Sequence, residues 1–159
     1  MESIDAEAKR LKAGGVDILI ALGHSGYEVD QAIAAGVPDI DLVVGGHSHS
    51  LLYSGTAPSV EEPEGPYPTL VRQPGTRRMV PVVQAYAFTK YMGLFKLQFD
   101  EEGEVVAWEG QPKLLNGSTV QGDSLQCFTF YLRRGTSTQV YMSILSSFLP
   151  SSQKAQKSL

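Results

Sequence analysis

The first part of the chain alternates between amphipathic segments and continuous apolar runs. Residues 2–13 place apolar side chains on one helical face and charged side chains on the others, which predicts a helix that ends at a glycine pair. Residues 16–22 form an unbroken apolar run, which is typical of a strand covered on both faces. The pattern therefore begins as a helix followed by a buried strand.

The same order repeats in the next twenty residues. Residues 27–36 place Val29, Ala32 and Ile33 on one side of a second short helix, and residues 39–44 form another apolar strand. Helix, strand, helix, strand is the repeat of a parallel sheet. The pattern thus predicts an α/β fold.

Beyond Tyr53 the pattern changes. Residues 54–68 are rich in proline, glycine and acidic residues, which indicates an exposed excursion without regular structure. Residues 79–87 resume as a strand, and residues 92–110 have the pattern of a hairpin with its turn at 101–103. The last forty residues contain aromatic clusters without a clean period, and the final ten are expected to be disordered.

Composition narrows the class of protein. With 159 residues, 42% apolar and 19% charged, the chain is typical of a soluble globular fold. A net charge of −4 gives no basic surface for nucleic acid or anionic lipid. The single cysteine, Cys127, cannot form an internal disulfide and is expected to be a small buried residue. The sequence indicates neither a secretory signal nor a membrane anchor within this chain.

The candidate chemistry lies in three histidines. His24, His47 and His49 follow the predicted strands, and the loops at the carboxyl ends of parallel strands converge on one edge of the sheet. Neutral imidazole is a common metal ligand, and the flanking glycines allow tight turns beside an ion. The alternative is that each histidine is a solvated polar residue at a strand end. Two Gly-His pairs after two strands favour a metal role for His24 and His47. His49, two residues after His47, can project toward a second ion but has less support from the residues alone.

Other chemistries have less support. The segment GHSG does not match the G-x-S-x-G elbow of serine hydrolases, and the glycine pairs match no nucleotide-binding fingerprint. Asp30, Asp39 and Asp41 flank the predicted strands. Each is interpreted as an ordinary charge on a helix surface or at a strand entry.

Three motifs in this order resemble the ecto-5'-nucleotidases, which are calcineurin-like metallophosphoesterases. They are LGHSG at 22–26, VVGGHS at 43–48 and VPVVQAYAFTKYMG at 80–93. The resemblance covers residues 1–118, which it identifies as the latter part of the catalytic domain. Residues 119–159 do not match the family and are expected to be a divergent, partly disordered tail.

The resemblance implies a partial calcineurin-like fold, with layered β-sheets flanked by helices and incomplete at its N-terminus. It implies two divalent metal ions, commonly zinc, and hydrolysis of nucleoside 5'-monophosphates such as AMP. By position in the motifs, His24 and His47 are ligands of one ion and His49 is a ligand of the other. Ecto-5'-nucleotidases commonly have an amide residue at position 49.

The resemblance also implies what this chain lacks. The family's Asp-x-His and Gly-Asn-His motifs, which supply a bridging aspartate and the catalytic histidine, do not occur here. The chain alone is therefore expected to be inactive or weakly active. One alternative is a truncated, non-catalytic chain that misfolds or modulates a full-length partner. Another is a related phosphoesterase acting on nucleotide sugars or cyclic nucleotides.

The resemblance further implies an extracellular or cell-surface location. The full-length family implies a possible homodimer and membrane attachment only through a C-terminal anchor that is absent here. Nucleoside monophosphate is then the expected substrate partner.

Overall fold

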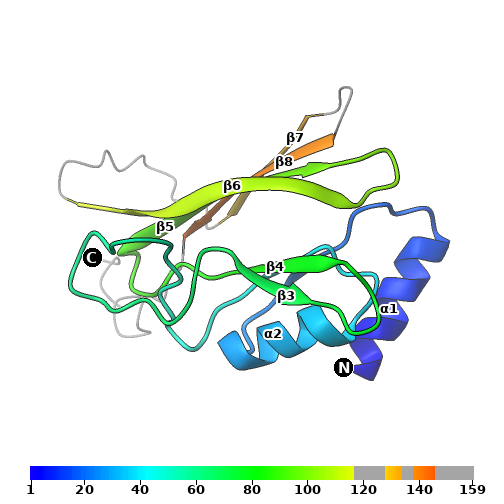
Figure 1. The fold of residues 1–159 in the computed structure, drawn as a ribbon, viewed down its shortest axis with the longest axis horizontal. Helices are drawn as coiled ribbons and strands as arrows, with labels where there is room; N and C mark the ends of the chain where they lie inside the picture. The colour runs from blue at the N-terminus through cyan, green and yellow to red at the C-terminus, as the bar shows by residue number, and fades with distance from the viewer. Residues whose placement is uncertain (117–127, 134–137, 146–159) are drawn as a thin grey trace, which may run out of the picture.

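The computed structural model of the chain describes residues 1–116, 128–133 and 138–145. Its elements are α1 (Glu2–Ala13), β1 (Ile20–Leu22), α2 (Tyr27–Gly36), β2 (Leu42–Val44), β3 (Thr69–Arg72), β4 (Met79–Val83), β5 (Tyr91–Phe99), β6 (Val105–Leu114), β7 (Phe128–Arg133) and β8 (Thr138–Leu145). Two sheets form two layers. The helices α1 and α2 lie against the layer that contains β3 and β4, on the side opposite the second sheet (Figure 1).

The first sheet confirms the predicted α/β repeat. Its strand order is β1-β2-β4-β3, in which β1, β2 and β4 are parallel and β3 is antiparallel to β4. Leu22 pairs with Val44, so that β1 and β2 end at the same level. The loops that carry the histidines therefore leave the sheet side by side, as the sequence predicted.

The second sheet is antiparallel, in the order β6-β5-β8-β7. The predicted hairpin is confirmed, because β5 and β6 pair along their length around the turn at 100–104. Strands β7 and β8 come from the tail, where the sequence predicted no strand. β8 pairs with β5 from Phe99 to Met92, because an open strand edge offers unpaired backbone groups to any compatible segment.

The core lies between the sheets and beneath α2. All three residues of β2 are buried, and Phe95, Leu97 and Phe99 of β5 pack into the same apolar cluster. On one face of α2 the buried residues are Tyr27, Asp30, Ile33 and Ala34. The face predicted for this helix was wrong in part, because Val29 is 47% exposed while Asp30 is fully buried.

Strand bounds also differ from prediction. The strand expected over 16–22 begins only at Ile20, and Leu22 is 53% exposed because β1 lies at the edge of its sheet. The run from 39 becomes a strand at Leu42, and β3 was not predicted. The excursion at 54–68 has no named strand or helix, as expected.

Several predictions lie outside the described residues. They are the burial of Cys127 and the disorder of the last ten residues. The division of the chain at residue 118 stays a prediction. No helix in the described ranges has the length and apolar character needed to cross a membrane.

Candidate functional site

Three loops meet at the carboxyl edge of the first sheet. Backbone hydrogen bonds join them: the amide of Gly23 donates to Val44 at 3.0 Å, and that of Gly26 donates to Gly46 at 3.1 Å. The amide of Gly45 in turn donates to Val83, the last residue of β4, at 2.9 Å. The loops after β1 and β2 are thus held to each other and to β4, which gives a fixed frame for the side chains they carry.

The structure brings two of the three predicted histidines together. The ring centroids of His24 and His47 are 5.1 Å apart, in an edge-to-face arrangement at 74°. Both side chains are exposed, although the backbone beneath them is bonded into the sheet edge. Two imidazole rings from loops 23 residues apart in sequence therefore lie side by side on the same surface.

A glycine permits the close approach of the His24 ring to the second loop. A Cβ atom at Gly46 would lie 2.9 Å from Nδ1 of His24, and a Cβ atom at Gly26 would lie 3.7 Å from Cδ2 of His47. Each histidine ring thus lies against a glycine of the other loop. Gly46 is the glycine that makes room for the opposite ring, because a Cβ atom there would crowd His24, whereas one at Gly26 would make an ordinary van der Waals contact with His47.

The loop that carries His47 is strained and internally bonded. His47 and His49 have positive φ angles of 81° and 56°, which non-glycine residues seldom adopt and which cluster at functional sites. The hydroxyl of Ser48 accepts the amide of Tyr27 at 3.0 Å, and its oxygen lies 2.7 Å from that of Ser50. These bonds hold the loop against the start of α2.

Gln84, the first residue after β4, supports the same loop. Its side-chain oxygen Oε1 accepts a hydrogen bond from the backbone amide of Ser50 at 2.7 Å. Its side-chain nitrogen Nε2 donates to the backbone carbonyl of Gly46 at 3.3 Å. The side chain is almost fully buried. Gln84 therefore fixes both ends of the segment that presents His47.

His49 lies in a different environment from the other two histidines. Its ring packs edge-on against Phe88, with centroids 5.0 Å apart, and Phe88 is 64% exposed. Phe88 belongs to a turn in which Tyr86, Phe88 and Thr89 all have positive φ angles. The structure thus places His49 against an aromatic turn.

A buried carboxylate lies beneath the histidine pair. Asp30, in the first turn of α2, is fully buried, and its Oδ1 accepts the hydroxyl of Ser25 at 2.6 Å. Its Oδ2 has no hydrogen-bond partner of normal geometry among the described residues. Burial raises the pKa of Asp30, and the Ser25 hydroxyl, the charge of His24 and the Gly46 amide offset this in part.

The residues present fit a divalent metal ion in part. Two neutral imidazoles supply two of the roughly four ligands that zinc takes. Within the described ranges no group of three or more histidine, cysteine or acidic side chains could hold an ion. The site therefore has the right donor chemistry for one metal but not a full ligand set.

Comparison with known proteins was made on sequence and on structure. No family model matches the chain. A curated 5'-nucleotidase from Diplobatis ommata is 51% identical over 121 residues, and the human 5'-nucleotidase is 48% identical over 124 residues. These alignments cover 76% and 78% of this chain. The chain is a homologue of the 5'-nucleotidases.

Solved structures of 5'-nucleotidase homologues extend the agreement to the fold. A 5'-nucleotidase precursor from Thermus thermophilus matches with a TM-score of 0.66 at 38% identity, over 72% of this chain. The NAD nucleotidase of Haemophilus influenzae matches with a TM-score of 0.65 at 30% identity, over 70% of this chain. The expected fold class, an incomplete α/β metallophosphoesterase fold, is confirmed.

The homologous region is a small part of the relatives. The chain spans about a fifth of the length of the curated 5'-nucleotidases it matches, and 22% of each solved chain.

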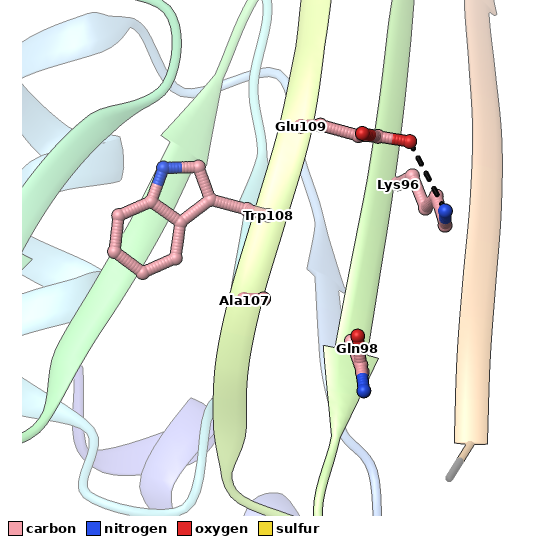
Figure 2. Close-up of a pocket in the computed structure, with 5 residues that line it drawn as sticks. All are labelled: Lys96, Gln98, Ala107, Trp108 and Glu109. Carbon is pink, nitrogen blue, oxygen red and sulfur yellow. Dashed lines mark hydrogen bonds and ion pairs between the residues drawn. The ribbon is translucent and has the colours of Figure 1, made fainter.

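The pockets found among the described residues lie away from the carboxyl edge of the first sheet and its histidine loops. A pocket of about 70 Å³ is lined by residues of β5 and β6, where Lys96 and Glu109 pair at 3.0 Å. Figure 2 shows these side chains. Trp108 points away from that pair (Figure 2). A small-molecule site usually needs roughly 300 Å³ or more, so this pocket is too small for a nucleotide.

Sequence reasoning missed Asp30 and Gln84. Asp30 was interpreted as a surface charge, and the structure corrects this because the carboxylate lies under the loops and not in solvent. Asp41, given the same interpretation, is also buried. The available signal was the glycine at position 45: a Cβ atom there would overlap Oδ2 of Asp30.

Proposed function

We propose that this chain carries part of the catalytic domain of a nucleotide hydrolase of the 5'-nucleotidase type. The observation that carries the proposal is the facing pair His24 and His47 at the carboxyl edge of the sheet. Homology to proteins named 5'-nucleotidase supplies the class of reaction. Release of phosphate from nucleoside 5'-monophosphates such as AMP is the reaction proposed.

In this proposal His24 and His47 hold one divalent ion, commonly zinc, and His49 contributes to a second. When bound, such ions activate a water molecule and stabilise the charge that develops on the transferred phosphoryl group. The chain's own contribution is rigid placement. Gly46 leaves space beside the His24 ring, and the bonds of Ser48 hold the loop that carries His47 against the start of α2.

The chain does not supply the whole machinery within the residues described. No third ligand joins the histidine pair there, so the remaining ligands and the catalytic acid or base must come from another segment. We therefore expect the chain alone to bind a metal weakly and to hydrolyse AMP slowly or not at all.

A non-catalytic role is the second candidate, and the open edge of β1 favours it. Among the residues that the structure describes, β1 pairs only with β2, and Leu22 is 53% exposed. An unpaired edge with an exposed apolar side chain favours association with another chain. In that case the chain would modulate a longer relative.

The identity of the nucleotide substrate is also a proposal. Relatives of this chain include proteins named apyrase, from Aedes aegypti, and NAD nucleotidase. A substrate other than AMP, such as a nucleotide sugar or cyclic nucleotide, is therefore the alternative within the same chemistry. The relative named snake venom 5'-nucleotidase supports the proposed extracellular or cell-surface location.

The test is phosphate release from AMP with added zinc, for the full chain, His24→Ala and His47→Ala, with zinc content measured on the same samples. Phosphate release that either substitution abolishes supports the enzymatic proposal. Zinc bound at about one ion per chain without phosphate release supports the metal role of the pair and limits the phosphatase activity to longer relatives. Zinc below about half an ion per chain, with no phosphate release, contradicts a metal role for the pair.

A further inference from the structure

Asp30 occupies the space where the two histidine loops meet. Its Oδ1 accepts the hydroxyl of Ser25, which is next to His24 in sequence, at 2.6 Å. Its Oδ2 lies where a Cβ atom on Gly45 would be, two residues before His47. The carboxylate thus touches the loop of each histidine while being fully buried itself.

Backbone hydrogen bonds also connect Asp30 to both histidine loops. The amide of Asp30 donates to the carbonyl of Gly26 at 2.9 Å, and the amide of Gly26 donates to the carbonyl of Gly46 at 3.1 Å. A displacement of Asp30 would therefore move the loop after β1 relative to the loop after β2. The distance between the two imidazoles depends on that relation.

A purely structural role explains these contacts less well. Burying a carboxylate without full hydrogen bonding costs free energy, and here one oxygen lacks a partner of normal geometry among the described residues. An apolar side chain of similar size would fill the space above Gly45 at lower cost. An apolar side chain could not supply the acceptor for the Ser25 hydroxyl or a carboxylate group beneath the two histidine loops.

We propose that Asp30 is a positioning residue for the His24–His47 pair: its buried carboxylate, wedged against Gly45 and bonded to Ser25, fixes the separation and orientation of the two rings. The proposal rests on the proposed metal role of the pair. Groups behind metal ligands orient those ligands and tune their affinity for metal, and Asp30 would act in this way through Ser25 and Gly45. Asp30 itself is not a ligand here, because it lies beneath the loops.

The experiment compares Asp30→Asn with Glu28→Gln in the full chain. Asn keeps the size of the side chain and an acceptor for Ser25 but removes the charge. Glu28 is exposed on the same helix and supplies the same change of charge as a matched control. The readouts are Co²⁺ affinity by calorimetry, the visible spectrum of bound Co²⁺, and thermal unfolding of the metal-free protein.

We expect Asp30→Asn to weaken Co²⁺ binding about 10- to 100-fold and to change the Co²⁺ spectrum, with Glu28→Gln unchanged. A structural role alone would lower the unfolding temperature without changing the spectrum of bound Co²⁺. Wild-type affinity and spectrum in Asp30→Asn would overturn the proposal. If Asp30→Asn does not fold, Ser25→Ala removes the bond to the carboxylate and should weaken binding by a smaller factor.

A second readout separates this proposal from the metal role itself. If the wild-type chain binds no Co²⁺, the proposed metal site fails, and the ring ¹⁵N shifts of metal-free His24 then test Asp30. We expect these shifts to change in Asp30→Asn and to stay the same in Glu28→Gln. Unchanged His24 shifts in Asp30→Asn would overturn the positioning role whatever the metal result.

Discussion

Two buried aspartates lie at opposite ends of β2 and differ in how they are partnered. Asp41 precedes the strand; its Oδ2 accepts the amide of Leu19 at 2.8 Å, and its Oδ1 pairs with Arg78 at 2.6 Å. Asp30 lies beyond the other end, with one oxygen bonded to Ser25 and the other without a partner of normal geometry among the described residues. Burial raises the pKa of both carboxyls.

The difference separates an end of the sheet whose buried charge is paired within the chain from the end where we propose the metal site. At the amino end, the cations of Arg78 and Lys12 and the amide of Leu19 offset the pKa shift of Asp41, so that charge is compensated within the chain. At the carboxyl end no lysine or arginine pairs with Asp30 in the ion pairs of the described residues. That end instead exposes two imidazoles, where a bound cation would supply the compensation.

The largest expected effect tests how tightly the carboxyl end is packed. In Gly45→Ala the new methyl group would overlap the Asp30 carboxylate, and the backbone at Gly45 is not in the left-handed region, so the effect is steric. We expect the free energy of unfolding to fall by about 3 kcal/mol, measured by urea denaturation. Gly23→Ala, where a Cβ atom would lie 3.7 Å from Ser25, is the matched control.

The double variant Gly45→Ala/Asp30→Ala sharpens the same test. Removing the carboxylate makes room for the methyl group, so part of the lost stability should return. If the double variant is as unstable as the sum of the single variants, Asp30 is not what fills the space above Gly45.

The next effect tests the amino end. In Asp41→Asn one of two donors, the Leu19 amide or Arg78, would face an amide nitrogen in place of an acceptor. We expect a loss of about 2 kcal/mol of unfolding free energy, with Co²⁺ affinity unchanged within about twofold because the substitution lies at the far end of the strand. A large loss of Co²⁺ affinity in Asp41→Asn would remove the distinction between the two ends.

A smaller effect tests a carboxylate near the carboxyl edge that is fully paired. Glu61, in the excursion, pairs with Lys90 and accepts the hydroxyl of Tyr91 at 2.9 Å. The bond from Lys90 lowers the pKa of Glu61 from 4.5 to about 2. Because the folded pKa is lowered, this pairing contributes stability above pH 4.5 that is lost as the pH falls toward 2.

We therefore expect Glu61→Gln to flatten the loss of stability between about pH 4.5 and pH 2, measured by thermal unfolding at a series of pH values. Glu62→Gln, an exposed neighbour, should leave the acid dependence unchanged. Asp30 and Asp41 have raised pKa values and the opposite sign: their contribution is greatest at low pH and falls as the pH rises. An unchanged acid profile in Glu61→Gln would mean that the Lys90 pairing is not maintained in solution.

The smallest effect concerns His49. Phe88→Ala removes an exposed ring, so the unfolding free energy should change by less than about 0.5 kcal/mol. Because the phenyl ring lies edge-on to His49, the ring proton shifts of His49 should nevertheless move, while those of His24 stay in place. Equal shifts at both histidines would contradict the separate environments that the structure gives them.

The sequence predicted the parts of the molecule that depend on local pattern. The helix over residues 27–36, the hairpin around 101–103 and the adjacent ends of β1 and β2 all follow from periodicity and chain order. The meeting of His24 and His47 followed in turn, because parallel neighbours end at one edge. These features need no knowledge of distant contacts.

The features that the sequence did not predict depend on tertiary partners. Hydrophobicity assigned Val29 to the buried face of α2, but space above Gly45 and a bond to Ser25 turned Asp30 inward instead. The tail strand β8 shows no clear period and forms because β5 has an open edge. In both cases a neighbour far along the chain determined the local structure.

The central claim, that His24 and His47 together hold a divalent ion, is tested most directly by titrating the full chain with Co²⁺ and following its visible spectrum. We expect the wild type to bind about one ion per chain. We expect His24→Ala, His47→Ala and the double variant to lose binding to a similar extent, because two ligands of one ion act as a unit. Wild-type affinity retained in His24→Ala or in His47→Ala would contradict the claim.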